Sequence, residues 1–217
     1  DAFTAYATSQ GDRIVDHESK EVWLDRFDRA PGRVGNGWVL DQGFGPLVDI
    51  RDEGIGIDGQ NDRGGRTRAF RSLPPDRFLA FSCVLTVGEK AKGTRAGVFI
   101  SSERTRPGGE SQVTAEVVIS RNREGQLEAR VQKSPTDEDA RFKQVVGPEW
   151  PIGQPIRVEI ERVGDDLDAT FTIYIDGEPV ATNVECDRLT SSRQPINFGA
   201  FVGGEAGRRA DLFMDDV

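Results

Sequence analysis

Two glutamates with strand spacing are the first candidates for chemistry. Glu159 and Glu161 alternate with apolar residues in the segment Pro-Ile-Arg-Val-Glu-Ile-Glu-Arg-Val, so we expect both side chains on one strand face, about 6.5–7 Å apart. Carboxylates about 5–9.5 Å apart can cleave glycosidic bonds when one is held protonated and the other ionised. Arg157 and Arg162 lie in the same segment, and the sequence favours the alternative of a solvated strand face with cross-strand ion pairs.

Aromatic rings that could stack on a sugar are the second candidates. Trp150 lies in the turn-rich loop Pro-Glu-Trp-Pro-Ile-Gly, and alternation places Tyr174 on the polar face of its strand. A sugar site also needs charged or amide groups for the hydroxyls, and Arg157 and Glu159 are our candidates for that role. We therefore predict carbohydrate binding by Trp150, Tyr174, Arg157 and Glu159. For Trp150 the alternative is a lid over the edge of the core.

Two local arginine clusters stand out in an acidic protein, Arg63-Gly-Gly-Arg-Thr-Arg68 and Arg104-Thr-Arg106. Ion pairing with the chain's own carboxylates is one interpretation, and contact with an acidic sugar or a partner chain is the other. Gly64-Gly65 is not followed by Gly-Lys-Ser/Thr, so no phosphate-binding loop is predicted.

Charge and rare residues exclude several classes of function. The net charge of −9 argues against nucleic acid and anionic membranes as partners, and mildly against acidic glycans. No apolar run reaches the roughly 18 residues of a spanning helix. The single histidine, His17, lies in a polar N-terminal stretch, which excludes a His-rich zinc centre. Cys83 and Cys186 are either buried thiols or a disulfide pair, and the sequence leaves both open.

Short strands separated by turns must position these residues. From about residue 21 the apolar residues alternate with period two, and Asp176-Gly177 and Glu124-Gly125 predict tight hairpins. The predicted strands are 22–27, 37–41, 66–71, 77–87, 95–102, 113–121, 127–132, 141–146, 155–163, 169–175, 178–182, 196–202 and 210–217. This pattern predicts one antiparallel β-sandwich over residues 21–217, preceded by a polar N-terminal arm or linker over residues 1–20.

The block from Trp23 to Trp38, Trp-Leu-Asp-Arg-Phe-Asp-Arg-Ala-Pro-Gly-Arg-Val-Gly-Asn-Gly-Trp, resembles the opening of concanavalin A-like lectin/glucanase domains. Segments 49–59, 156–180 and 198–217 resemble later hairpins and closing strands of the same family. The resemblance covers about residues 21–217 and implies an all-β fold, an antiparallel β-sandwich of the concanavalin A-like jelly-roll type. It also implies a concave sheet face that forms a groove, with Trp38 in the core.

The resemblance weighs against catalysis. Glucanases of this fold carry a Glu-x-Asp-x-x-Glu strand, whereas Glu159-Ile-Glu-Arg-Val lacks the third carboxylate. Alginate lyases of this fold use a Gln-x-His strand and a tyrosine, whereas His17 precedes the domain. The sequence therefore supports neither active site.

A structural calcium ion is also implied by the resemblance, because domains of this fold often carry one and pair their first and last strands. That pairing would bring Asp25 or Asp28 near Asp215 and Asp216, and we predict Asp28, Asp215 and Asp216 as metal ligands. A second oxygen-rich turn, with Asp58, Asn61 and Asp62, lies around Gly59. Plain turn capping by Asp and Asn is the alternative for both places.

Together these features predict a non-catalytic glycan-recognition or adhesion module at an extracellular location or at the cell or virion surface. Its expected partner is a glycan or polysaccharide, with neither nucleic-acid binding nor membrane insertion. Two alternatives stay open: a glycoside hydrolase of the same fold, and a structural or decoration domain of a phage or cell-surface assembly, with other protein subunits as partners.

Overall fold

A computed structural model describes most of the chain. The described residues are 13–15, 21–23, 25–27, 31–32, 34–41, 47–52, 54–60, 62, 65–91, 93–105, 111–132, 141–145, 149–164, 169–186, 189, 194–215 and 217.

Strands account for nearly all regular structure in these residues. They are β1 (Arg13–Val15), β2 (Glu21–Trp23), β3 (Val39–Asp41), β4 (Leu47–Arg51), β5 (Gly54–Gln60), β6 (Gly65–Leu73), β7 (Ala80–Val87), β8 (Arg95–Thr105), β9 (Ser111–Arg121), β10 (Leu127–Gln132), β11 (Arg141–Val145), β12 (Pro155–Val163), β13 (Thr170–Ile175), β14 (Glu178–Glu185), β15 (Ile196–Gly204) and β16 (Arg209–Asp215). Two single-turn 3-10 helices, η1 (Pro75–Arg77) and η2 (Glu89–Ala91), flank β7. Within the described ranges, no helix is long and apolar enough to cross a membrane.

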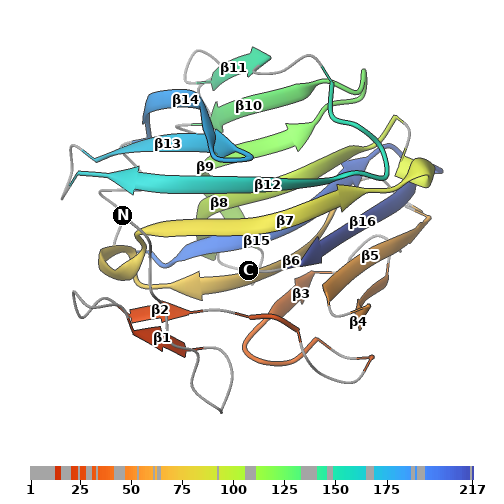
Figure 1. The fold of residues 1–217 in the computed structure, drawn as a ribbon, viewed down its shortest axis with the longest axis horizontal. Coiled ribbons are helices and arrows are strands. Elements are labelled where there is room, and N and C mark those ends of the chain that lie inside the picture. The colour runs from red at the N-terminus through yellow and green to blue at the C-terminus, as the bar shows by residue number, and fades with distance from the viewer. Residues whose placement is uncertain are drawn as a thin grey trace.

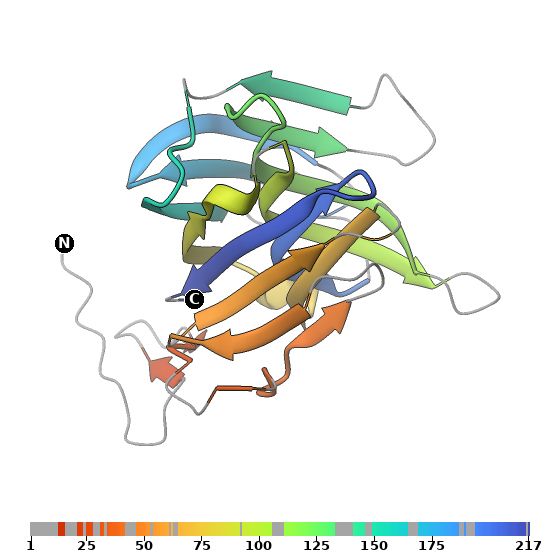
Figure 2. The same cartoon turned by 90° about the vertical axis from the view of Figure 1, so that its right-hand side faces the viewer.

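The described strands form two seven-stranded sheets and a separate two-stranded sheet of β1 and β2, and every pairing within the two large sheets is antiparallel. The first sheet has the order β11-β10-β9-β8-β15-β6-β3, and the second has the order β14-β13-β12-β7-β16-β5-β4. Figure 1 looks onto the second sheet, with β12 and β7 in front of β8 and β15, and Figure 2 gives the view turned by 90°. The predicted antiparallel β-sandwich is confirmed.

Alternation along the strands builds the core between the sheets. In β12, Ile156, Val158 and Ile160 are buried, while Arg157 and Glu159 lie on the other side of the strand. In β8, Val98 and Ile100 face the same core from the opposite sheet. The period of two in the sequence therefore separates a dry interior from two outer faces.

Turn chemistry fixes the register of the two predicted hairpins. Asp176 and Gly177 both have positive φ, 50° and 84°, as the primed turn between β13 and β14 requires. Between β9 and β10 only Gly125 has positive φ, 93°, and the amide of Gly125 donates to the carbonyl of Asn122. That geometry is a three-residue loop that ends in a glycine bulge.

The Gly-Asn-Gly-Trp motif contacts the segment at Asp25 that pairs with the end of the chain. Asn36 and Gly37 have positive φ, and the amide of Trp38 donates to the carbonyl of Gly35, so β3 begins only at Val39. The turn directs Nε1 of Trp38 to Oδ2 of Asp25 at 2.9 Å. Asp25 in turn exchanges two backbone hydrogen bonds with Val217, so the segment that begins the predicted sandwich pairs with the last described residue.

The boundary predicted at residue 20 stays a prediction. Within the predicted arm, β1 pairs with β2, which begins just after it. His17 and the rest of the arm lie outside the described residues.

Candidate functional site

The outer face of the first sheet is unusually polar and hollowed, and we call it the hollowed face. Residues that alternate with the core project from it on six strands of the sheet: Val39, Asp41, Arg66, Arg68, Phe70, Ser72, Arg95, Phe99, Ser101, Glu103, Glu116, Val118, Glu128, Arg130, Asn197 and Phe201.

An aromatic cluster lies at the centre of the hollowed face. Phe99 and Phe201 are fully buried, with ring centroids 6.2 Å apart, and Phe70 lies 6.3 Å from Phe99. Between Phe70 and Phe99 runs Gly199 of β15, where a Cβ would collide with the backbone of Ala69. A glycine is therefore required where β15 approaches β6, and it leaves space above β15 for the two rings.

Arginines cover this cluster and share one buried glutamate. Arg66 donates two hydrogen bonds to Glu116, of 2.7 and 3.0 Å, and Arg130 donates a third of 2.7 Å. The guanidinium carbon of Arg66 also lies 4.7 Å from the centre of the Phe201 ring. Burial alone would raise the pKa of Glu116, but the hydrogen bonds and charges of Arg66 and Arg130 outweigh burial and lower that pKa.

Arg68 occupies the neighbouring position on β6 and holds two further carboxylates. It donates to Asp41 at 3.0 and 3.2 Å and makes a short charged hydrogen bond to Glu103. Its guanidinium carbon lies 5.1 Å from the Phe70 ring centre. Burial opposes the charged form, yet the two carboxylates prevail and raise the pKa of Arg68.

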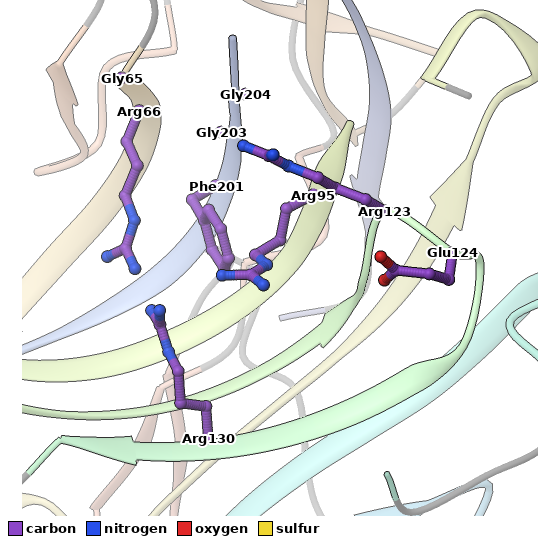
Figure 3. Close-up of a pocket in the computed structure, with 9 residues that line it drawn as sticks. All are labelled: Gly65, Arg66, Arg95, Arg123, Glu124, Arg130, Phe201, Gly203 and Gly204. Atoms are coloured by element: carbon purple, nitrogen blue, oxygen red, sulfur yellow. The ribbon is translucent and has the colours of Figure 1, made fainter. Parts of the chain in front are cut away.

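Two open hollows lie at opposite ends of the strands on this face. The first, of about 430 Å³, has Arg66, Arg95, Arg123, Arg130 and Phe201 among its lining residues (Figure 3). The second, of about 470 Å³, is lined by Val39, Asp41, Arg68, Phe70, Ser72, Glu103, Gln194, Pro195 and Asn197, with Leu40. Both volumes fall within the range typical of small-ligand sites.

Three of the four predicted sugar-binding residues lie together on the opposite sheet. Glu159 of β12 pairs with Tyr174 of β13, and Arg157 lies on the same strand face as Glu159. The hydroxyl of Tyr174 donates to Glu161 at 2.8 Å, and this bond raises the pKa of Tyr174. Burial raises the pKa of Glu159, and the neighbouring Glu161 carboxylate adds to the increase. Neither hollow described above reaches these residues.

Trp150 does not form the exposed platform that its loop predicted, because its side chain is fully buried. The loop is held at both ends: the amide of Trp150 donates to the carbonyl of Gly125, and that of Gly153 donates to Val87. These long-range bonds turn the indole into the core. The expectation of a stacking surface at Trp150 is corrected here to the lid over the core edge.

The metal prediction lies mostly outside the described residues. Asp28 and Asp216 are not described, and Asp215 ends β16 on the second sheet. In the described ranges, His, Cys, Asp and Glu side chains form no group of three that could hold a metal ion. Cys83 and Cys186 are both buried thiols.

The sequence missed most of the hollowed face. Arg66 and Arg68 belong to the arginine cluster that the sequence singled out, and the structure shows the first interpretation of that cluster, ion pairing with the chain's own carboxylates. Contact of the cluster with an acidic sugar or a partner chain stays a prediction. Glu103, Glu116 and Phe70 carried no local signal. Only the order of β9, β8, β15 and β6 in the sheet brings them to one surface.

Comparisons with known proteins show the fold. No protein-family model and no curated protein matches the sequence. A crystal structure of a non-specific endo-β-1,3(4)-glucanase from family GH16 matches with a TM-score of 0.64 and 11% identity, over 100% of this chain and 98% of that chain. LamAcat from Zobellia galactanivorans matches with a TM-score of 0.62 and 10% identity, over 90% of this chain and 95% of that one.

A binding module has the same architecture. The carbohydrate-binding module CBM66 from Bacillus subtilis matches with a TM-score of 0.53 and 14% identity, over 83% of this chain and 93% of that chain. Together with the two antiparallel seven-stranded sheets, these likenesses show that the chain has the concanavalin A-like jelly-roll fold.

Proposed function

We propose that the protein is a non-catalytic glycan-recognition module and that it binds sugar on the hollowed face. The observation that carries the proposal is the second hollow, where an apolar wall meets several polar groups. Val39 is half exposed beside Phe70, while Asp41, Ser72 and Gln194 present a carboxylate, a hydroxyl and an amide. Pyranose rings have apolar faces and hydroxyl edges, which this combination of surfaces complements.

Pre-ordering of the hollow supports recognition. Arg68 fixes Asp41 and Glu103, and Ser72 donates to Asn197 at 2.6 Å. Side chains that are already ordered lose less conformational entropy when a ligand binds. The hollow therefore resembles a formed site and not a surface that must rearrange.

The distribution of carboxyl pKa values supports a non-catalytic role. A glycosidase needs one carboxyl held protonated close to a second that is ionised. On the hollowed face the pKa of Glu116 is lowered, whereas the raised pKa of Glu159 belongs to the opposite sheet. Glu159 and its neighbour Glu161 therefore lie on a face that neither hollow reaches, and Glu116 on the hollowed face is not held protonated.

Structural neighbours support a glycan as the partner, because they include both GH16 glucanases and a carbohydrate-binding module. A module with this role would act outside the cytoplasm, at the cell surface or in the surrounding medium. Calcium binding by Asp28, Asp215 and Asp216 stays part of the proposal.

A glycan array combined with a reducing-sugar assay tests the proposal. We expect retention by at least one glycan with no release of reducing ends. Asp41→Asn and Gln194→Ala should weaken retention, whereas Asp49→Asn on the second sheet should not. Release of reducing ends would overturn the non-catalytic part, and equal retention by all variants would overturn the site.

A further inference from the structure

The first hollow, at the other end of the hollowed face, has a different chemistry from the second. Of the described residues that line it, four are arginines and one is a glutamate. In Figure 3 the side chains of Arg66, Arg95 and Arg130 lie around the ring of Phe201, while Glu124 lies apart from them. The hollow therefore presents hydrogen-bond donors almost throughout.

The carboxylates that balance these arginines lie beneath the surface or at its rim. Glu116, which Arg66 and Arg130 share, has only 3% of its side chain exposed, and Glu128, 3.5 Å from Arg95, has 1%. Arg123 pairs at 2.8 Å with Glu205, which is well exposed. An incoming ligand thus meets guanidinium groups first, and two of the balancing charges are covered.

Donor capacity remains after these pairings. Each guanidinium carries five N–H groups, and the hydrogen bonds to Glu116 use two on Arg66 and one on Arg130. The Nε atoms of Arg95 and Arg130 also have no hydrogen-bond partner in the described part of the chain, but both are covered, so a ligand would reach them only after the side chains shift. Burial lowers the pKa of Arg130, and the positive charges of Arg66 and Arg95 add to the decrease although Glu116 opposes it.

A neutral sugar hydroxyl needs an acceptor as well as a donor, and this lining offers few acceptors. A carboxylate or sulfate group accepts several hydrogen bonds and donates none, and guanidinium groups match its geometry bidentately. We propose that the first hollow is an anion subsite and that the ligand is an acidic glycan bearing carboxylate or sulfate groups. This inference rests on the proposed glycan-binding function and names its ligand class.

The net charge of −9 makes the inference specific. A protein with that charge repels polyanions as a whole, so binding of a polyanion must come from a local arrangement. Arg66, Arg68 and Phe70 form one row along β6, and the Cα atoms of Arg66 and Phe70 are about 13 Å apart. This row connects the anion subsite to the second hollow. A single glycan chain could then place an acidic sugar in the anion subsite and a neutral sugar ring in the second hollow.

The test uses the full chain with four soluble polymers in affinity electrophoresis: polygalacturonate, dextran sulfate, uncharged dextran and laminarin. We expect retention by one or both acidic polymers, with the carboxylated and sulfated arms showing which anion is preferred. Retention should weaken as salt is added, since surface charge interactions are screened.

Variants then locate the site. Arg123→Gln removes only an exposed ion pair and should leave folding intact, and the double variant Arg95→Gln/Arg123→Gln should weaken acidic-polymer binding at least tenfold. Arg209→Gln, at an exposed arginine of β16 on the other sheet, removes one positive charge, as Arg123→Gln does, and should bind as the wild type does. Thermal unfolding of each variant checks that loss of binding is not loss of fold.

The outcomes separate this inference from the proposed function. Binding of laminarin or dextran that depends on Asp41, with no preference for acidic polymers, would overturn the anion subsite and leave the glycan-binding function standing. Equal weakening by Arg209→Gln and Arg123→Gln would also overturn the subsite. Absence of binding to every polymer and every array glycan would overturn both.

Discussion

Arg66 and Glu116 are joined by two hydrogen bonds, of 2.7 and 3.0 Å, although they lie 50 positions apart in the chain. Arg66 belongs to β6 and Glu116 to β9, and β15 and β8 run between them in the sheet. The pair therefore bridges four strands across the hollowed face. Of the two partners, Glu116 is the one shielded from water, with 3% of its side chain exposed.

Glu116→Gln should lower the free energy of unfolding by about 2–3 kcal/mol at pH 7, because charged hydrogen bonds to Arg66 and Arg130 are lost. The folded-state pKa of Glu116 is lowered, so this stabilisation is complete above about pH 4.3 and disappears as the pH falls through the folded-state value. Urea denaturation at pH 7 and at successively lower pH measures the difference between variant and wild type.

Glu205→Gln is the matched control, because it also removes a glutamate paired with an arginine. That pair is exposed, and its loss should cost less than about 1 kcal/mol. A difference between wild type and Glu116→Gln that stayed constant as the pH fell would contradict the assignment of Glu116 as an ionised, buried partner.

Asp25→Ala should destabilise the fold by about 3 kcal/mol. The carboxylate is fully buried and accepts hydrogen bonds from the amide of Phe27 and from Nε1 of Trp38, both at 2.9 Å. Its removal leaves two buried donors without an acceptor, and each such donor costs about 1–3 kcal/mol. Chemical denaturation followed by tryptophan fluorescence provides the measurement. Asp49→Ala, at a half-exposed aspartate, should change stability by less than about 0.5 kcal/mol.

Substitution of Tyr174, on the second sheet, distinguishes between two candidate glycan sites. Arg157, Glu159 and Tyr174, which the sequence predicted as sugar-binding residues, lie together but away from both hollows. We expect Tyr174→Ala to retain glycan binding on an array while Asp41→Asn loses it. The reverse result would place the glycan on the second sheet and would disprove the hollowed-face site.

Calcium binding stays a prediction that thermal unfolding can check. If Asp28, Asp215 and Asp216 share an ion, Tm should rise on addition of calcium and fall with a chelator, because a ligand that binds only the folded state stabilises that state. Asp215→Asn should reduce that shift. A Tm that is unchanged by calcium and by the chelator would count against the site.

Local sequence signals predicted the framework well. The alternation in residues 155–163 predicted β12, and the Asp176-Gly177 turn predicted the hairpin between β13 and β14, because period and turn type are properties of neighbouring residues. The Gly-Asn-Gly-Trp resemblance pointed to Trp38 in the core, and Trp38 is buried, with 7% of the residue exposed.

Long-range pairing decided what local signals could not. Trp150 lies between prolines in a loop that indicates exposure, yet its backbone bond to Gly125 directs it inward. The partners of Arg66 and Arg68 depend on the order of strands in the sheet, which alternation alone leaves undetermined. The arginine cluster could therefore be recognised in the sequence, but its carboxylate partners could not.

The ion-paired cluster of Arg66, Glu116 and Arg130 has a thermodynamic consequence for any ligand that binds the hollowed face. Its side chains are already immobilised by charged hydrogen bonds and ring contacts, so a bound glycan would meet a rigid surface. Calorimetry should then show association with favourable enthalpy and only a small change in heat capacity, since little apolar area is newly buried. Selectivity on such a rigid face depends on the spacing of the acidic groups in the glycan. A glycan with a different spacing binds more weakly, because the protein side chains do not rearrange to reach its acidic groups.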